Sequence, residues 1–211
     1  MAALEVFPTE LIELIMTSLE LGDITSLRLT CRRIEDKTSQ QFGNAFRYKD
    51  VKLTTTALQK FVRITGQGRF GCLLRNCTLT GIVSDEEITT DDVPEHGRLL
   101  TDAFRNLRHR SPSGGLDSLT LGLAGRVGGE LVLPDDIRVR HGWRAIWDAA
   151  ARTFRTTITA LEESQVSVGE HLDIFSTVTG CSLACDVFIA SAGIFASAQV
   201  FGSLRNHGMQ H

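Results

Sequence analysis

Few residues in this sequence stand at the spacings that chemistry requires. Gly66, Gly68 and Gly71 spell a dinucleotide-binding fingerprint. That fingerprint needs a strand before it and a helix after it, so that the pyrophosphate meets the helix N-terminus. The flanking residues predict the reverse order, a helix before the glycines and a strand after them. We therefore expect no cofactor at these glycines.

A zinc site is the other candidate for chemistry. Cys181, Cys185 and His171 are suitable ligand types, but a structural zinc site needs four ligands at close spacing and no fourth is evident. We favour ordinary core thiols and predict no metal. The sequence also has no Gly-x-Ser-x-Gly, His-Glu-x-x-His or phosphate-binding P-loop motif. It therefore offers no catalytic residues from which to build an enzyme.

The composition is that of a folded chain of one or two domains. It has 211 residues, of which 42% are hydrophobic and 22% charged. The net charge of −3 leaves no basic surplus to attract phosphates, so nucleic acid is a poor candidate partner. Five scattered cysteines and a first segment without the basic start of a signal peptide fit a reducing compartment. We expect a cytoplasmic or nuclear protein, or one found in both compartments.

Residues 10–21 predict a helix with an unusually wide apolar surface. Its apolar side chains cover roughly 220° of the circumference, where a helix buried on one face needs about 100°. These side chains are Leu11, Ile12, Leu14, Ile15, Met16, Leu19 and Leu21. This helix must therefore be covered on two sides.

Two more helical stretches follow, one after the N-cap candidate Asp23 and one carrying Ile34. Between Phe7 and Ile34, 13 of 28 residues are apolar. A unit of about 40 residues cannot bury that much alone, because small domains leave a large share of their surface exposed. Either the rest of the chain or another protein must supply the cover.

These residues resemble an F-box. The resemblance lies in the order of five pieces: Phe7-Pro8-Thr9-Glu10-Leu11-Ile12, then Ile15-Met16, then Leu19, then Asp23-Ile24, then Leu27-Arg28-Leu29-Thr30-Cys31-Arg32-Arg33-Ile34. Phe7 stands where the family usually has Leu, and Thr30 where Val is commoner. Phe42 or Phe46 would have to replace a Trp that is common after the third helix. The match covers about 30 to 40 residues, and the alternative is an ordinary amphipathic helical hairpin.

The resemblance implies binding to the Skp adaptor of cullin–RING ubiquitin ligases. F-box proteins dock on that adaptor through these helices and present a protein substrate with the remaining chain. The residues that match the family's apolar and adaptor-facing set are Pro8, Leu11, Ile15, Ile24, Leu27, Leu29 and Cys31. Some of them must be internal core, and the sequence does not divide the two groups.

The remainder alternates apolar helical faces with short strands. Helical faces are predicted at 57–64, 99–107 and 143–161, and strands are centred on Leu79, Leu121 and Ile174. The strands contain full or partial copies of the L-x-x-L-x-L pattern of leucine-rich repeats, but the centres are 42 and 53 residues apart, where regular repeats run about 20–29. We predict an α/β, mostly α fold, with an F-box at 1–48 and an irregular, leucine-rich-repeat-like helix–strand solenoid at 49–211. Many fungal F-box proteins look similar.

Several alternatives stay open. The second region could be an unrelated α/β domain, and its last repeat could be cut short at the C-terminus. The acidic stretch between Asp85 and Glu95, and the arginines Arg105, Arg108 and Arg110, are interpreted as solvated insertions rather than docking sites. Val187–Leu204 has no charge over 18 residues, and a buried helix is favoured there over a membrane anchor. The rival functions are a non-catalytic scaffold, an enzyme of unrecognised type and a membrane-tethered protein.

Overall fold

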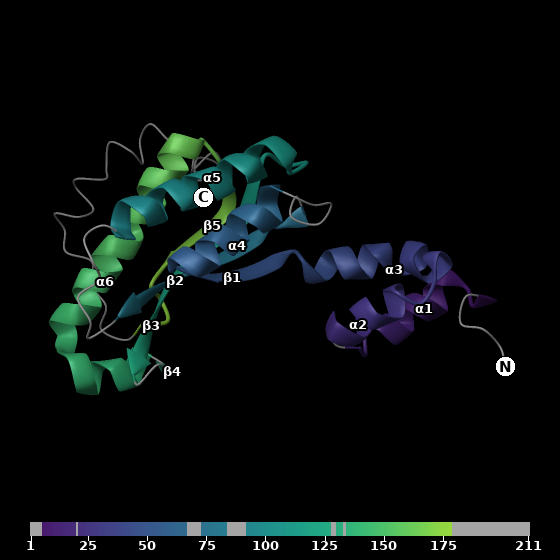
Figure 1. Cartoon of the computed structure of the whole chain (residues 1–211), viewed down its shortest axis with the longest axis horizontal. Coiled ribbons are helices and arrows are strands. Elements are labelled where there is room, and N and C mark those ends of the chain that lie inside the picture. The colour runs from purple at the N-terminus through teal and green to yellow at the C-terminus, as the bar shows by residue number, and fades with distance from the viewer. Residues whose placement is uncertain are drawn as a thin grey trace, which may run out of the picture. The chain divides into compact units, whose positions relative to one another are not determined.

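The computed structural model describes residues 6–19, 21–66, 73–83, 92–127, 130–132 and 134–178. The chain divides into two compact units, Met1–Arg47 and Tyr48–His211, each of which is described separately (Figure 1). The boundary expected from the sequence lies one residue further along, between residues 48 and 49. We call the two parts the helical unit and the β/α unit.

The helical unit consists of three helices, α1 (Thr9–Met16), α2 (Leu21–Arg28) and α3 (Arg32–Ala45). Both shorter helices pack on α3. The apolar core between them is small, and its buried members are Ile12, Met16, Ile24, Ile34 and Phe42. Because α1 and α2 contain only eight residues each, this packing and not intrinsic helix propensity must hold them.

Arg28 of α2 forms hydrogen bonds and an ion pair with residues of α3. Its guanidinium donates to the carbonyl of Glu35 at 3.1 Å and to the Thr38 hydroxyl at 3.3 Å, and it pairs with the Glu35 carboxylate at 3.3 Å. The same group lies 4.2 Å from the centroid of the Phe42 ring, a cation–π contact. Arg28 is 8% exposed, and these contacts satisfy its buried charge and join α2 to α3.

The β/α unit alternates strands and helices. In chain order its elements are β1 (Tyr48–Lys52), α4 (Thr55–Gly66), β2 (Asn76–Val83), α5 (Asp92–Arg110), β3 (Gly115–Val127), β4 (Glu130–Val132), α6 (Pro134–Ser164) and β5 (Ser167–Ile174). Four strands form a parallel sheet in the order β1-β2-β3-β5, which is also their order along the chain. The short β4 pairs antiparallel with the end of β3. The fold is thus mixed α/β, as the sequence predicts.

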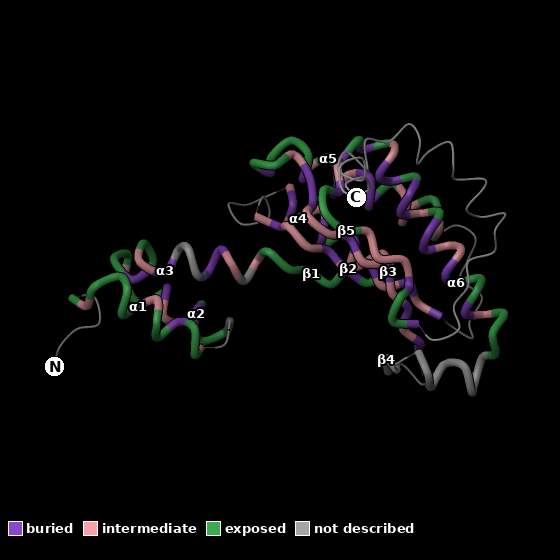
Figure 2. Tube along the Cα trace, turned by 180° about the vertical axis from the view of Figure 1, so that it is seen from behind, coloured by how far each residue is buried: buried purple, intermediate pink, exposed green. Residues whose placement is uncertain are grey.

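The helices form a layer against the sheet. Helix α5 packs between α4 and α6 (Figure 1), and α4 and α6 also contact the sheet. Alternate residues of β2, from Cys77 to Val83, are buried, and the residues between them are partly exposed. One face of the sheet therefore belongs to the core, as the buried segments of the strands and helices in Figure 2 show.

The three strand centres chosen from the sequence lie in one row across the sheet. Leu79 is the register partner of Leu121, and Leu121 that of Ile174. Val51 of β1 extends the row. The sequence predicts no strand there, because five residues with one buried position give a weak period-two signal. Helix α6 also begins earlier than expected and kinks at Gly142, whose φ of 73° glycine adopts without strain.

Several sequence predictions fall outside the described residues. They concern Gly68 and Gly71, the acidic residues 85–91, Cys181 and Cys185, and the uncharged segment Val187–Leu204. Among the residues that are described, no helix combines the length and the apolar character needed to cross a bilayer.

The close approach of β3 to β5 yields a stability prediction. A Cβ on Gly115 would overlap the backbone carbonyl of Ser167 in β5, whereas a Cβ on Gly122 in the same strand would meet nothing within 4 Å. We expect Gly115→Ala to lower the free energy of unfolding by about 1–3 kcal/mol, since the strands must separate. Gly122→Ala, the matched control, should leave it unchanged or raise it slightly. Urea unfolding of both variants tests this prediction. Equal free energies of unfolding for the two variants would contradict the pairing of Gly115 in β3 with Ser167 in β5.

Candidate protein-binding surface

The apolar surface of α1 is divided into an inner and an outer half. Ile12 and Met16, one turn apart, are 1% and 2% exposed and face α3 and the core. Leu11, Leu14 and Ile15 are 48%, 66% and 38% exposed. We call these three residues the outer strip. They stand at positions i, i+3 and i+4, so they lie side by side on one face of the helix.

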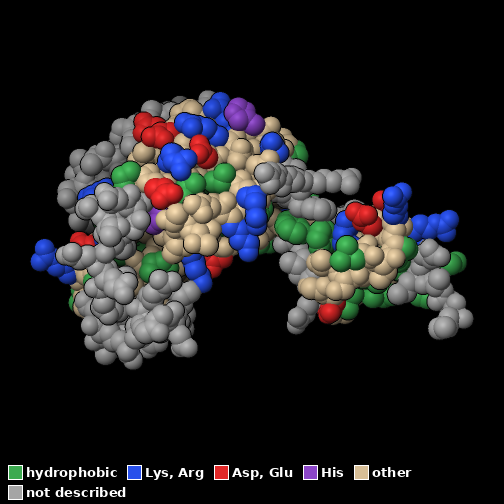
Figure 3. Space-filling model, viewed as in Figure 1, with side chains coloured by type: hydrophobic (Ala, Val, Ile, Leu, Met, Phe, Trp, Pro, Cys, Tyr) green, Lys and Arg blue, Asp and Glu red, His purple; other side chains and the backbone are tan. Residues whose placement is uncertain are grey.

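The outer strip is the surface that the wide apolar arc predicts. A helix that needed only one buried side would place polar residues opposite Ile12 and Met16. Instead α1 has leucine and isoleucine on adjoining positions, and the charged residues Glu10 and Glu13 lie beyond them. Hydrophobic side chains accordingly reach the surface of the helical unit (Figure 3).

A second exposed apolar residue follows α2. Leu29 is 83% exposed in the turn between α2 and α3, where the Thr30 hydroxyl donates to the Leu27 carbonyl at 2.6 Å. Cys31, which follows Thr30, has an extended backbone conformation and is the N-cap residue of α3. The turn thus holds an unburied leucine in a fixed local conformation.

The residues predicted to contact an adaptor separate into three groups. Pro8, Leu11, Ile15 and Leu29 are exposed, and Leu27 and Cys31 are partly buried. Ile24 is 7% exposed and belongs to the helical core, so it supports the surface rather than forming it. Leu14 is also exposed but does not belong to the predicted set. Its place in the apolar arc of α1 is the sequence signal that points to it.

The sheet presents a different kind of surface. On β2 and β3, the residues between the buried positions are partly exposed. In the first half of each strand they are polar, and adjacent rows align Asn76 with Ser118 and Thr78 with Thr120. Thr80 completes the group on β2. We call these five residues the polar sheet face. Ser118 donates to the Asn76 side-chain oxygen at 2.6 Å, and Thr80 to Asp50 at 2.9 Å.

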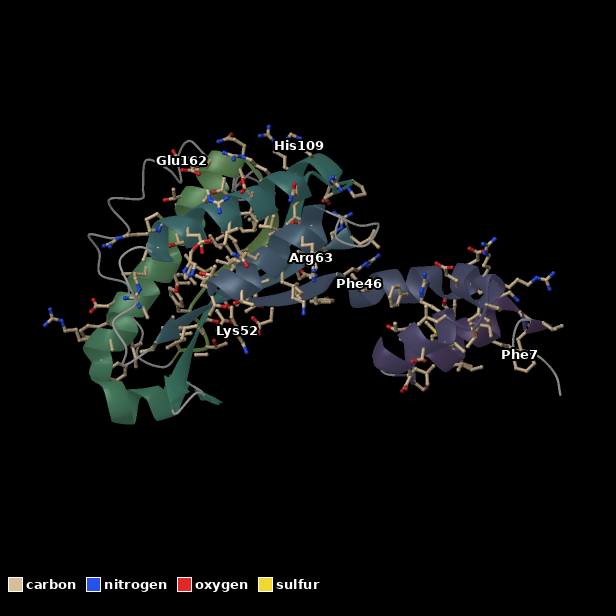
Figure 4. All side chains as sticks on the ribbon, viewed as in Figure 1. Phe7, Phe46, Lys52, Arg63, His109 and Glu162 are labelled. Carbon is tan, nitrogen blue, oxygen red and sulfur yellow. The ribbon has the colours of Figure 1, made fainter. Side chains whose placement is uncertain are left out.

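Charged residues stand at both ends of the polar sheet face. Asp50 of β1 and Asp173 of β5 share the row of Thr78 and Thr120. Figure 4 shows Lys52 at the β1 side. A row of hydroxyls between two carboxylates can donate and accept hydrogen bonds along an extended partner. Within the described part of the chain, no group of three His, Cys, Asp or Glu side chains is close enough to hold a metal.

Cys77, the one described cysteine in the β/α unit, has a thiol of low reactivity. Cys77 is buried on β2, and burial raises the pKa of its thiol from 9.0 to about 12, with a further rise from the charge of Asp50. The thiolate, which is the nucleophilic form, is therefore scarce at neutral pH. This agrees with the interpretation of the cysteines as small apolar residues.

We expect Cys77 to resist iodoacetamide in the native protein at pH 8 and to react in urea, as peptide mass spectrometry would show.

The raised pKa of Cys77 also makes the stability of the fold depend on pH. The contribution of this thiol to the free energy of unfolding is complete below pH 9.0, because the folded and the unfolded chain both hold the neutral thiol there. It is lost as the pH rises from 9.0 towards about 12, because the unfolded chain ionises first. Rapid native labelling of Cys77 would contradict its burial.

Comparison with known proteins identifies no relative. No family model, curated protein or solved structure matches this chain.

Proposed function

We propose that this chain is the substrate-recognition subunit of a Skp–cullin–F-box ubiquitin ligase. The helical unit would bind the Skp adaptor, and the β/α unit would bind a protein substrate. The observation that carries the proposal is the outer strip, three exposed apolar residues on α1 beside a core that is already closed. The ordered resemblance of residues 7–34 to an F-box supports the same partner.

The energetics favour a partner with an apolar surface. Covering a leucine or isoleucine fully contributes roughly 1.5–3 kcal/mol, and less where the side chain is already half-buried. Leu11, Leu14 and Ile15 together therefore supply a few kcal/mol, and association costs roughly 4–15 kcal/mol. Pro8 and Leu29 must join the contact, which requires a partner that covers α1 and the turn after α2 together.

The β/α unit fits the role of substrate carrier. Its strands follow chain order with a helix between successive parallel strands, and we propose that it is an irregular, leucine-rich-repeat-like solenoid. The polar sheet face would then bind the substrate. The mechanism is proximity, because holding the substrate near the charged ubiquitin carrier raises its effective concentration without any chemistry by this chain.

Co-expression with a Skp adaptor tests the proposal. We expect the two proteins to purify as a 1:1 complex through size-exclusion chromatography. A full-length protein that is stable, monomeric and unable to bind the adaptor would overturn the proposal. That outcome would favour the alternative, a non-catalytic scaffold unconnected with ubiquitination.

A further inference from the structure

A groove runs between α5 and α6 on the β/α unit, independent of the surfaces discussed above. Its volume is about 390 Å³, which is within the range of pockets for small ligands. Three arginines line it, Arg98 and Arg105 from α5 and Arg155 from α6, together with the hydroxyls of Thr156 and Thr159. The one carboxylate in its lining is Glu163.

The two helices are held in a fixed alignment along this groove. At one end Thr101 donates to the Glu163 carboxylate at 3.1 Å. At the other end His96 of α5 and Arg152 of α6 line the same smaller cavity. Arg98 and Arg155 come between these two points on their helices, so they line the groove at similar heights from opposite helices.

Among the residues that line the groove, three arginines stand against one carboxylate. Asp102 is shared, at 3.5 Å each, by Arg98 and Arg105, both of which are at least half exposed. Ion pairs as exposed as these contribute little to stability. Arg155 has no hydrogen bond or ion pair to any described residue, and Arg152 stands one turn before it on α6. In a chain whose net charge is −3, this is a local excess of cations that repel one another.

We propose that the α5–α6 groove binds a phosphate monoester. A guanidinium donates two parallel hydrogen bonds to a phosphate, and a phosphate at neutral pH carries about two negative charges and three acceptor oxygens. Arg98 and Arg155 supply the opposing guanidinium groups and Thr156 a hydroxyl donor. A carboxylate offers two acceptor oxygens and one negative charge, whereas a phosphate offers three acceptor oxygens and about two charges, so the phosphate is better matched to two guanidinium groups and a hydroxyl. The ester could belong to a small metabolite or to a phosphorylated side chain of a partner.

Isothermal titration of the full-length protein tests this. The probes are glycerol 1-phosphate and a phosphoserine flanked by alanines, each compared with its unphosphorylated form. We expect at least one phosphate to bind, and Arg155→Gln to weaken it by at least about tenfold. Arg63→Gln, an exposed arginine on α4 outside the groove (Figure 4), should change the dissociation constant less than about twofold.

Binding of the peptide alone would assign the site to a phosphorylated protein, and binding of glycerol 1-phosphate to a small molecule. If circular dichroism shows that Arg155→Gln disturbs the fold, Arg98→Gln gives the same comparison. The proposal is overturned if neither phosphate binds better than its unphosphorylated form, or if the groove variants bind like Arg63→Gln. Adaptor binding by the helical unit does not enter this measurement, so the two proposals fail separately.

Discussion

We expect that replacing Leu11 and Ile15 together by glutamate prevents the proposed binding of a Skp adaptor and leaves the protein folded. Both residues lie on the outer strip, so glutamate there remains solvated in the unbound protein. In the complex the two carboxylates would be covered by an apolar partner without a counter-charge, and burying an unpaired charge costs several kcal/mol. We expect the dissociation constant to rise at least about 100-fold, as measured by isothermal titration.

The control for this variant adds the same charge at the two ends of α1, at its first residue and at its C-cap. Thr9 and Thr17 are exposed and lie outside the outer strip, so Thr9→Glu with Thr17→Glu should alter the affinity by less than about fivefold. Circular dichroism confirms that both double variants keep their helices. If the Leu11 and Ile15 variant binds as tightly as this control, the adaptor does not use α1.

Truncating Phe104 to alanine destabilises the β/α unit by about 3–5 kcal/mol, the range for a buried phenylalanine. Phe104 of α5 is 0% exposed and belongs to the core shared by the helices and the sheet. Since whole domains are stable by only about 5–15 kcal/mol, the loss would be a large part of the total.

Tryptophan fluorescence in urea measures this loss for the β/α unit alone, because the chain has two tryptophans and both, Trp143 and Trp147, lie on α6. Tyr48→Ala, the truncation of an aromatic residue that is 72% exposed, should change stability by less than about 0.5 kcal/mol. Equal effects of the two truncations would show that the core is not built as described.

The sequence predicted those parts of the fold that depend on local periodicity. The wide arc of α1 follows from residue spacing alone, and the strand centres Leu79, Leu121 and Ile174 do lie in one row of the sheet. Both predictions succeed because apolar residues at period 3.6 or 2 mark a face regardless of what covers it.

Other features depend on contacts between distant parts of the chain, and the sequence could not supply them. Residue spacing does not show which half of the apolar arc of α1 faces α3. On spacing alone, Ile12 and Leu11 are equally good candidates for burial. The sequence predicts that Arg105 belongs to a solvated insertion, but it lines the same groove as Arg155, which is 50 residues away. Arg108 donates to the Ser164 carbonyl at 3.3 Å, which again requires the packed helices to be known.

Hydrogen–deuterium exchange with and without the Skp adaptor addresses the adaptor surface most directly. It reports amide protection along the whole chain, so no mutation is needed. We predict that the adaptor slows exchange in α1 and in the turn around Leu29, while β2 and β3 keep their rates. Unchanged exchange in α1 on saturation with adaptor, or protection confined to the β/α unit, would contradict the assignment of the outer strip as the docking surface.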